Sequence, residues 1–258
     1  MIGYMRRAFQ DVLGLAGLVA LFLTQSLAAQ EHFEIAVYPS ATAHHGEWEL
    51  EGHLNLASRG TSAFDGSVAP TQGQWRFAAE VTRGITDHVE VAGYVLGAQV
   101  PGMGLQYAGW RLRSRVRAPD SWRLPVKLGF SAEYETARPA FSESARTAEL
   151  SAIVERRFGA LQLLANSTFE RDLAGPQHEW EFEPRARAGF DVTRTVTLGL
   201  EYYGAFEAAI QKHQYYPTAE LRLGDDMTLQ VGVGFGGPSA GDRLIFKTRF
   251  EMELGGDR

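Results

Sequence analysis

The stretch RLRSRVR, residues 111–117, places an arginine at every second position. Successive side chains of a β-strand point to opposite faces, so a strand built here carries all its arginines on one face and Leu112, Ser114 and Val116 on the other. Adjacent like charges repel one another. A column of guanidinium groups backed by apolar residues therefore indicates a strand with an enclosed, charged side and a second side that faces an apolar environment.

The same alternation of apolar and polar residues repeats from Gly46 to Leu254 and predicts an all-β chain. Several alternating segments exceed ten residues, which is longer than the average strand of a soluble sheet and long enough for a tilted strand to cross a bilayer. We expect about twelve strands, at residues 46–57, 73–84, 88–97, 104–117, 122–135, 145–158, 160–170, 178–190, 195–206, 213–223, 227–236 and 242–254.

The connections between these segments alternate between tight turns and looser loops. The tight turns are expected at residues 84–88, 118–121, 158–159, 191–195 and 224–227. The looser loops are expected at residues 58–72, 98–104, 136–145, 171–178, 207–213 and 236–242. Short turns at one rim and longer loops at the other are typical of an outer-membrane β-barrel. The expected fold is a closed antiparallel up-and-down transmembrane β-barrel whose first and last strands pair, because hydrocarbon leaves no backbone group unpaired.

A secreted β-sandwich is the alternative all-β architecture, because its strands also alternate between apolar and polar side chains. Aromatic residues favour the barrel, since they lie near the strand ends on the apolar face, where two girdles mark the membrane interfaces. The expected interface aromatics are Trp48, Trp75, Trp122, Tyr134 and Trp180.

The N-terminus is typical of a secretory signal peptide. Arg6 and Arg7 precede an apolar run at residues 12–23, and Ser26 and Ala28 suit a cleavage site after residue 28. An uncleaved anchor is the alternative, but the run is short for a membrane span. The expected organisation is a signal peptide at 1–28, a periplasmic lead-in at 29–45, a transmembrane barrel at 46–254 and a periplasmic tail at 255–258. We therefore expect an outer-membrane protein with both termini in the periplasm.

Composition excludes several classes of protein. The chain has no cysteine, and therefore no lipoprotein anchor, disulfide framework or thiolate metal site. Removing residues 1–28 takes away two of 25 basic and one of 31 acidic residues and leaves a net charge of −7. A mildly acidic chain without a basic tail is a poor nucleic-acid binder. About 230 mature residues fit one all-β domain.

Three stretches carry a resemblance to a known family: GQWRFAAEVTRGITDHVEVAGYV at 73–95, FDVTRTVTLGLEYY at 190–203 and LGDDMTLQVGVGFG at 223–236. They resemble a family of proteobacterial outer-membrane barrels that is linked by name to a phenol-degradation pathway, the MetA pathway. The resemblance implies a transport or porin-like role without catalytic residues. Such barrels often end on an aromatic residue, whereas this chain ends its last strand at Leu254. Recognition by the barrel-assembly machinery would then depend on Phe250 or follow a less standard signal.

Strand direction predicts where the charges lie inside the barrel. A basic wall is expected on the fourth and fifth strands, formed by Arg111, Arg113, Arg115, Arg117, Arg123 and Lys127. An acidic wall is expected on the opposite side, mainly on the twelfth, first and second strands, formed by Glu47, Glu49, Glu51, Glu80, Glu90, Glu251 and Glu253. A mixed ladder is expected on the eighth strand, formed by Glu179, Glu181, Glu183, Arg185 and Arg187.

These walls favour an outer-membrane porin-like channel or transporter for small solutes, because charged rings and walls set the selectivity of pores. The main alternative is a barrel plugged by its own side chains that acts structurally, or as an adhesin, through its loops. An outer-membrane hydrolase is the third alternative, although no histidine lies in a known catalytic motif. We expect no cofactor and no metal site, since His44 and His45 lack further ligands nearby. The expected partners are outer-membrane lipid, the barrel-assembly machinery and small solutes.

Overall fold

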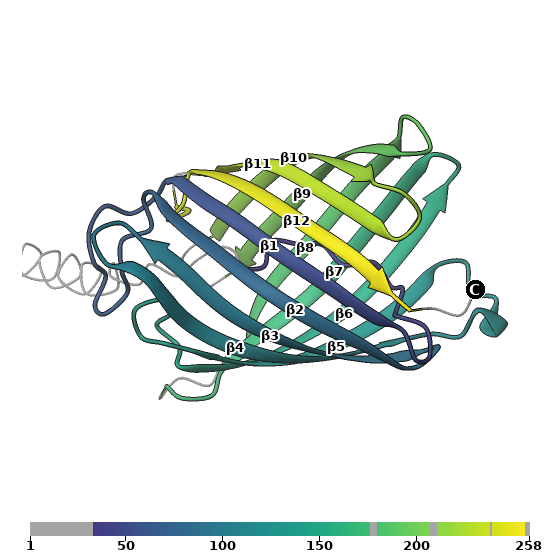
Figure 1. Cartoon of the computed structure of the whole chain (residues 1–258), viewed down its shortest axis with the longest axis horizontal. Coiled ribbons are helices and arrows are strands. Elements are labelled where there is room, and N and C mark those ends of the chain that lie inside the picture. The colour runs from purple at the N-terminus through teal and green to yellow at the C-terminus, as the bar shows by residue number, and fades with distance from the viewer. Residues whose placement is uncertain (1–32, 176–179, 207–210, 238, 256–258) are drawn as a thin grey trace, which may run out of the picture.

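Twelve antiparallel strands form a closed barrel in the computed structural model, which describes residues 33–175, 180–206, 211–237 and 239–255 (Figure 1). Each strand pairs with its neighbours in sequence, and the first pairs with the last. The predicted fold class is confirmed. The strands are β1 (Trp48–Arg59), β2 (Gln74–Thr86), β3 (Val89–Val100), β4 (Gly104–Arg117), β5 (Lys127–Ala137), β6 (Arg146–Phe158), β7 (Leu161–Asp172), β8 (Trp180–Asp191), β9 (Val196–Phe206), β10 (Gln211–Arg222), β11 (Met227–Gly236) and β12 (Leu244–Leu254).

The contact between β1 and β12 closes the ring. Its register runs from Trp48 opposite Leu254 to Arg59 opposite Leu244, with one irregularity near the end of β1. Closure leaves neither strand with a free edge, so no row of unpaired backbone groups is exposed. Among the described residues, no helix is long and apolar enough to cross a membrane.

One predicted strand starts later than expected. The sequence predicts a strand at residues 122–135, whereas the observed strand β5 begins at Lys127. The connection from β4 to β5 contains a short 3-10 helix, η1 (Asp120–Trp122). Proline has no backbone N–H for a strand ladder, and Pro119 and Pro125 flank this turn. Arg123 adopts a left-handed conformation with φ of 51°. Trp122 and Arg123 therefore belong to a turn, not to a strand.

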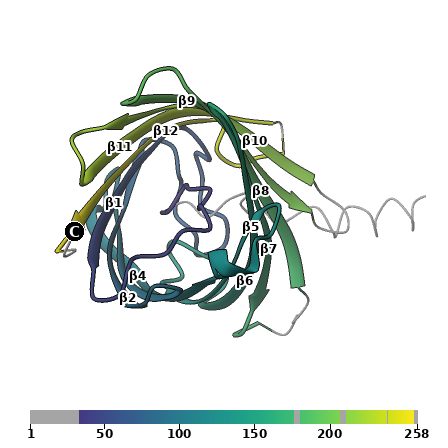
Figure 2. The same ribbon diagram turned by 90° about the vertical axis from the view of Figure 1, so that its right-hand side faces the viewer.

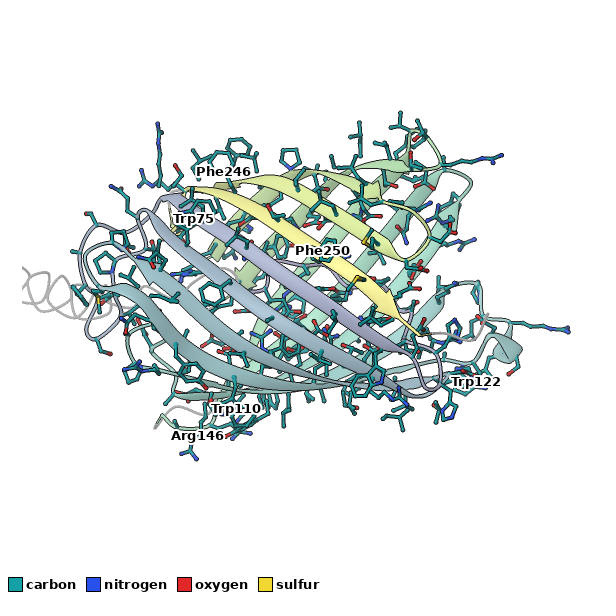
Figure 3. The ribbon with its side chains drawn as sticks, viewed as in Figure 1. Trp75, Trp110, Trp122, Arg146, Phe246 and Phe250 are labelled. Carbon is teal, nitrogen blue, oxygen red and sulfur yellow. The ribbon has the colours of Figure 1, made fainter. Side chains whose placement is uncertain are left out.

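The two faces of the barrel wall differ in chemistry. Large apolar side chains are exposed on the outside along every strand, whereas the inward positions carry buried charged and polar groups. Figure 3 shows Trp75 and Phe246 near one end of the barrel and Trp122 near the other. We call the first the long-loop end, since residues 60–73 and 138–145 connect strands there, and the second the short-turn end, since residues 87–88 and 159–160 do so.

Residues 33–43 run inside the barrel, as the purple chain within the ring of strands shows (Figure 2). We call them the lumenal segment. They belong to the predicted lead-in at 29–45, and their position inside the ring was not anticipated from the sequence. Most of them are buried. Gly46 N donates to Gly84 O at 3.0 Å where the chain leaves the lumen and enters β1. The predicted signal peptide, residues 29–32 and most of the predicted tail lie outside the described residues.

Loops fold together at the long-loop end. The Thr71 hydroxyl donates to Asp242, which joins the β1–β2 connection to the β11–β12 connection. Ala69 N donates to Ala140 O at 2.9 Å, which joins the first of these to the β5–β6 connection. The loop residue Phe141 packs edge-on against Phe33 of the lumenal segment, with 6.1 Å between the ring centroids. These contacts tie three connections and the lumenal segment together at the long-loop end.

Candidate functional site

The arginine column of β4 lies inside the barrel, where Arg111, Arg113 and Arg115 are buried. Each of the three contacts carboxylates from neighbouring strands or from the lumenal segment. Arg113 contacts Glu80 at 2.5 Å, and Arg115 contacts Glu90 at 2.6 Å. Buried guanidinium groups need such partners, because an unpaired charge in the interior is very costly. All three arginines thus lie on the inward face of β4.

The other members of the predicted basic wall lie at the short-turn rim. Arg117 donates to Asp87 O at 2.7 Å and contacts Asp120 at 3.3 Å. Arg123 and Lys127 are exposed and border a small cavity of about 90 Å³ beside the turn. Arg123 moves out of the wall because the prolines of this connection delay the start of β5. The buried basic wall is therefore confined to the three arginines of β4.

The carboxylates of the predicted acidic wall converge at the short-turn end. Cross-strand register places Glu49 opposite Glu253 and Glu51 opposite both Glu251 and Glu80. Like charges directly opposite one another on a sheet are destabilising. A cavity of about 230 Å³ opens beside them, and its acidic lining consists of Glu47, Glu49, Glu51, Glu80, Glu251 and Glu253.

The two walls do not face each other across empty space, because the lumenal segment joins them. Its Glu34 forms ion pairs with Arg111 and Arg113. Its Tyr38 ring lies beneath the guanidinium of Arg113, with 4.7 Å from Cζ to the ring centroid. The Tyr38 hydroxyl donates to Glu34, and its oxygen lies 3.1 Å from Glu51 Oε1 on the acidic side. Basic and acidic groups thus form one connected network.

Side chains of the wall satisfy the backbone of the lumenal segment. Asn166 donates to Tyr38 O at 3.0 Å and accepts from Tyr38 N at 2.9 Å, in the manner of a neighbouring strand. Asn55 donates to Phe33 O at 3.0 Å, and Ala43 N donates to Glu90 at 2.7 Å. Buried backbone groups need partners of this kind. The segment is therefore held along its length.

A second side of the lumenal segment is apolar. Its Ile35 and Val37 belong to a buried cluster with Leu164, Tyr203, Tyr216 and Ile245. Beneath this cluster Lys247 donates to Ile35 O at 3.0 Å and pairs with Glu201. Neither Lys247 nor Glu201 was among the predicted site residues. The period-two charge pattern places both side chains in the lumen but does not show what they bind.

The arginines of the predicted mixed ladder on β8 form ion pairs with carboxylates of β6, β9 and β10, and with Glu183 of β8 itself. Arg185 contacts Glu149 at 2.6 Å and Glu183 at 3.7 Å. Arg187 contacts Glu220 at 2.7 Å and Glu201 at 3.7 Å. Glu181 is partly buried on the same strand, and Glu179 lies outside the described residues.

The histidine pair lies at the short-turn rim, where the chain leaves the lumen. Both His44 and His45 are exposed. His45 N donates to Asp87 Oδ1 at 3.0 Å, and this backbone hydrogen bond, together with the nearby histidines, lowers the pKa of the Asp87 carboxyl. The β2–β3 turn therefore anchors the start of β1.

The interface aromatics predicted from the sequence lie on the outside of the barrel. Trp48, Trp75, Trp122 and Trp180 are exposed, and Tyr134 is partly exposed beside Trp110. Arg83 lies over the Trp48 ring at 4.7 Å from the centroid. These side chains bracket the apolar band at both ends of the barrel, as Figure 3 shows for Trp75 and Trp122.

Comparison with known proteins identifies the fold. No protein-family model matches the chain, and no curated protein matches it. Among solved structures, an outer-membrane channel from Pseudomonas putida F1 matches with a TM-score of 0.56 and 10% identity, over 86% of this chain and 100% of the other. The KdgM porin matches with a TM-score of 0.57 and 8% identity, over 80% of this chain and 99% of the porin. The NanC porin matches with a TM-score of 0.52 and 6% identity, over 81% of this chain and 99% of the porin. The chain has the fold of outer-membrane channel barrels.

Proposed function

We propose that this protein is an outer-membrane channel for small polar solutes whose passage is restricted by the lumenal segment. The observation that carries the proposal is the closed barrel with an apolar exterior and a charged interior, which is the arrangement of a membrane pore. The fold shared with porins and channels supports the same function. The proposal includes export by the predicted signal peptide and periplasmic termini.

The class of solute is proposed from the chemistry of the lumen. Glutamate and arginine side chains line the interior, and the cavity at the short-turn end is bordered by both. Such a surface suits hydrated, polar or charged molecules. A structural neighbour, the KdgM porin, has been solved in complex with disordered oligogalacturonate. Membership of the MetA-pathway family stays a prediction.

The lumenal segment sets the expected size of the conducting path. It occupies the interior along residues 33–43, and both its backbone and its side chains are bonded to the wall. Interiors of small barrels leave little free space once side chains fill them. We therefore expect a low conductance from the complete protein and a larger one once the segment is removed.

Planar-bilayer recording of the purified mature chain tests the proposal. The complete protein is expected to give small conductance steps, and a variant lacking residues 33–42 is expected to give steps several-fold larger. The lipid-side substitution Leu200→Ala serves as the control and is expected to conduct like the wild type, since Leu200 is exposed on the outside.

Each other outcome has a definite meaning. Absence of steps from both the complete chain and the shortened variant, when both are folded, would contradict a channel and favour a structural or adhesive barrel. Equal steps from the two proteins would leave the channel but refute restriction by the lumenal segment. Turnover of lipid or peptide without conductance would favour a hydrolase.

A further inference from the structure

Four ligand-type side chains meet inside the barrel, toward its short-turn end. One oxygen or nitrogen from each of Glu34, Glu51, His53 and Glu80 lies within 4.8 Å of the others. Glu51 and His53 share the inward face of β1, and Glu80 stands opposite Glu51 on β2. Glu34 comes from the lumenal segment. We call these four residues the Glu–His cluster.

The cluster is buried and contains an oxygen without a hydrogen-bond partner. The side chains of His53 and Glu80 are 1% and 2% exposed. Glu80 Oε1 accepts hydrogen bonds from Arg113 and from the Thr82 hydroxyl, whereas the buried Glu80 Oε2 accepts no hydrogen bond. Interior polar atoms are nearly always satisfied, so an orphaned carboxylate oxygen points to a missing partner.

The surrounding network carries more negative than positive charge. Ion pairs and the Tyr38 hydroxyl connect four guanidinium groups to seven carboxylates in the described part of the chain, an excess of three negative charges if all are ionised. Burying uncompensated charge is very costly. A bound cation would offset part of this negative charge. Its members are Arg111, Arg113, Arg115, Arg249, Glu34, Glu51, Glu80, Glu90, Glu133, Glu135 and Glu251.

We propose that the Glu–His cluster binds one divalent transition-metal ion of the zinc class. Carboxylate oxygens with an imidazole nitrogen form a ligand set that suits zinc and neighbouring metals, whereas calcium and magnesium prefer oxygen ligands alone. Two positive charges would offset most of the excess negative charge. Glu80 Oε2 is free to bind the ion while Glu80 Oε1 keeps its contact with Arg113.

The cavity at the short-turn end provides an entry path for the ion. Glu51 and Glu80 both line it, so the cluster is reached from this side of the barrel. Glu47, Glu49 and Glu253 line the same cavity, so carboxyl groups border the path to the cluster. Clefts lined by one sign of charge concentrate the opposite ion. A metal site requires such a route as well as its ligands.

Binding would tie the lumenal segment to the barrel wall. Glu34 belongs to the segment, and the remaining ligands belong to β1 and β2. An ion held by both would add a cross-link at the centre of the network. This inference does not depend on the identity of the solute, nor on whether the barrel conducts.

The test is a zinc titration of the complete mature chain in detergent after treatment with a chelator. Calorimetry and elemental analysis are expected to give one Zn²⁺ per chain, with much weaker binding of Mg²⁺. The variants H53Q and E80Q are expected to bind Zn²⁺ at least about tenfold more weakly, because each loses a ligand. The control E220Q removes a lumenal carboxylate outside the cluster and is expected to bind like the wild type.

Two measurements separate the cluster from other zinc sites. Binding that persists unchanged in H53Q and E80Q would overturn the proposal and point to the exposed His44 and His45. Absence of stoichiometric binding to the wild type would also overturn it. X-ray absorption spectroscopy of the zinc-loaded wild type identifies the zinc ligands without relying on the folding of a variant. We expect a zinc coordination shell of one imidazole nitrogen and several oxygens. A coordination shell with two imidazoles would refute the assignment.

Discussion

Single residues decide whether the interior of this barrel is stable. Lys247 and Glu201 are each 1% exposed, and their ion pair lies beneath the lumenal segment. Interaction between charges is strong in a poorly solvated interior, but so is the cost of leaving one charge without its partner. The Glu201 carboxylate also accepts hydrogen bonds from the Gln230 side chain at 3.1 Å and from the Tyr203 hydroxyl at 2.7 Å. The pair is therefore part of a satisfied network whose members depend on one another.

Replacing Lys247 with methionine is expected to lower the free energy of unfolding by about 3 kcal/mol, because Glu201 loses its main counter-charge. The double variant E201M/K247M is expected to recover most of that loss, since no charge then remains unpaired. Equilibrium unfolding in urea, with the protein refolded into lipid vesicles, measures both values. A double variant as unstable as K247M would show that charge pairing is not the cause.

At the scale of one element, the lumenal segment is an extended chain without a strand partner. Its Glu34 and Tyr38 contact the arginines of β4, and its Ile35 and Val37 pack on the opposite wall. The chain leaves the lumen where its backbone at residues 43–46 contacts Gly84 of β2. A Cβ at Gly84 would meet the backbone oxygens of residues 43 and 44 closer than real Cβ atoms approach. Glycine is required there because the two backbones touch.

Gly84→Ala is therefore expected to displace the end of the lumenal segment and to destabilise the barrel by about 1–3 kcal/mol, the usual cost of overpacking. The matched control is G52A on the adjacent strand β1, where an added Cβ meets no atom within 4 Å. Thermal unfolding followed by circular dichroism compares the two variants. If G52A were as unstable as G84A, the close approach at Gly84 would not explain the loss.

At the scale of the whole molecule, ring closure separates an apolar outside from a charged inside. Leu200, in the middle of β9, is 53% exposed, and Leu254, at the end of β12, is 38% exposed. Both point outward, although they differ in their distance from the ends of the barrel. In the proposed membrane setting, the cost of a charge on the outer face depends on depth.

Leu200→Arg is expected to cost about 2–4 kcal/mol in a lipid bilayer, and L254R at the rim about 0–1 kcal/mol. The physical reason is that an arginine at the rim reaches the headgroups, whereas one near the midplane stays in hydrocarbon. Reversible unfolding from vesicles measures both values. Equal costs for the two variants would argue against a membrane-spanning orientation of the strands.

Much of this architecture could be predicted because alternation is a local property of the chain. The number of strands, their antiparallel order and the inward position of the β4 arginines all follow from period-two patterning and ring closure. The start of β5 was predicted too early, since alternation continues through Trp122 and Leu124 while Pro125 prevents pairing. The lumenal segment was missed although residues 34–38 alternate like a strand, because its partners are side chains of the wall.

The sequence by itself determined a closed barrel with one apolar and one charged face, since side-chain direction along a strand depends only on the order of residues. Only the tertiary structure decided what fills the interior. Glu34, Glu51, His53 and Glu80 are brought together by the register of β1 with β2 and by the path of the lumenal segment. The path of the lumenal segment depends on its contacts with side chains of several strands, which the local alternation of residues does not encode.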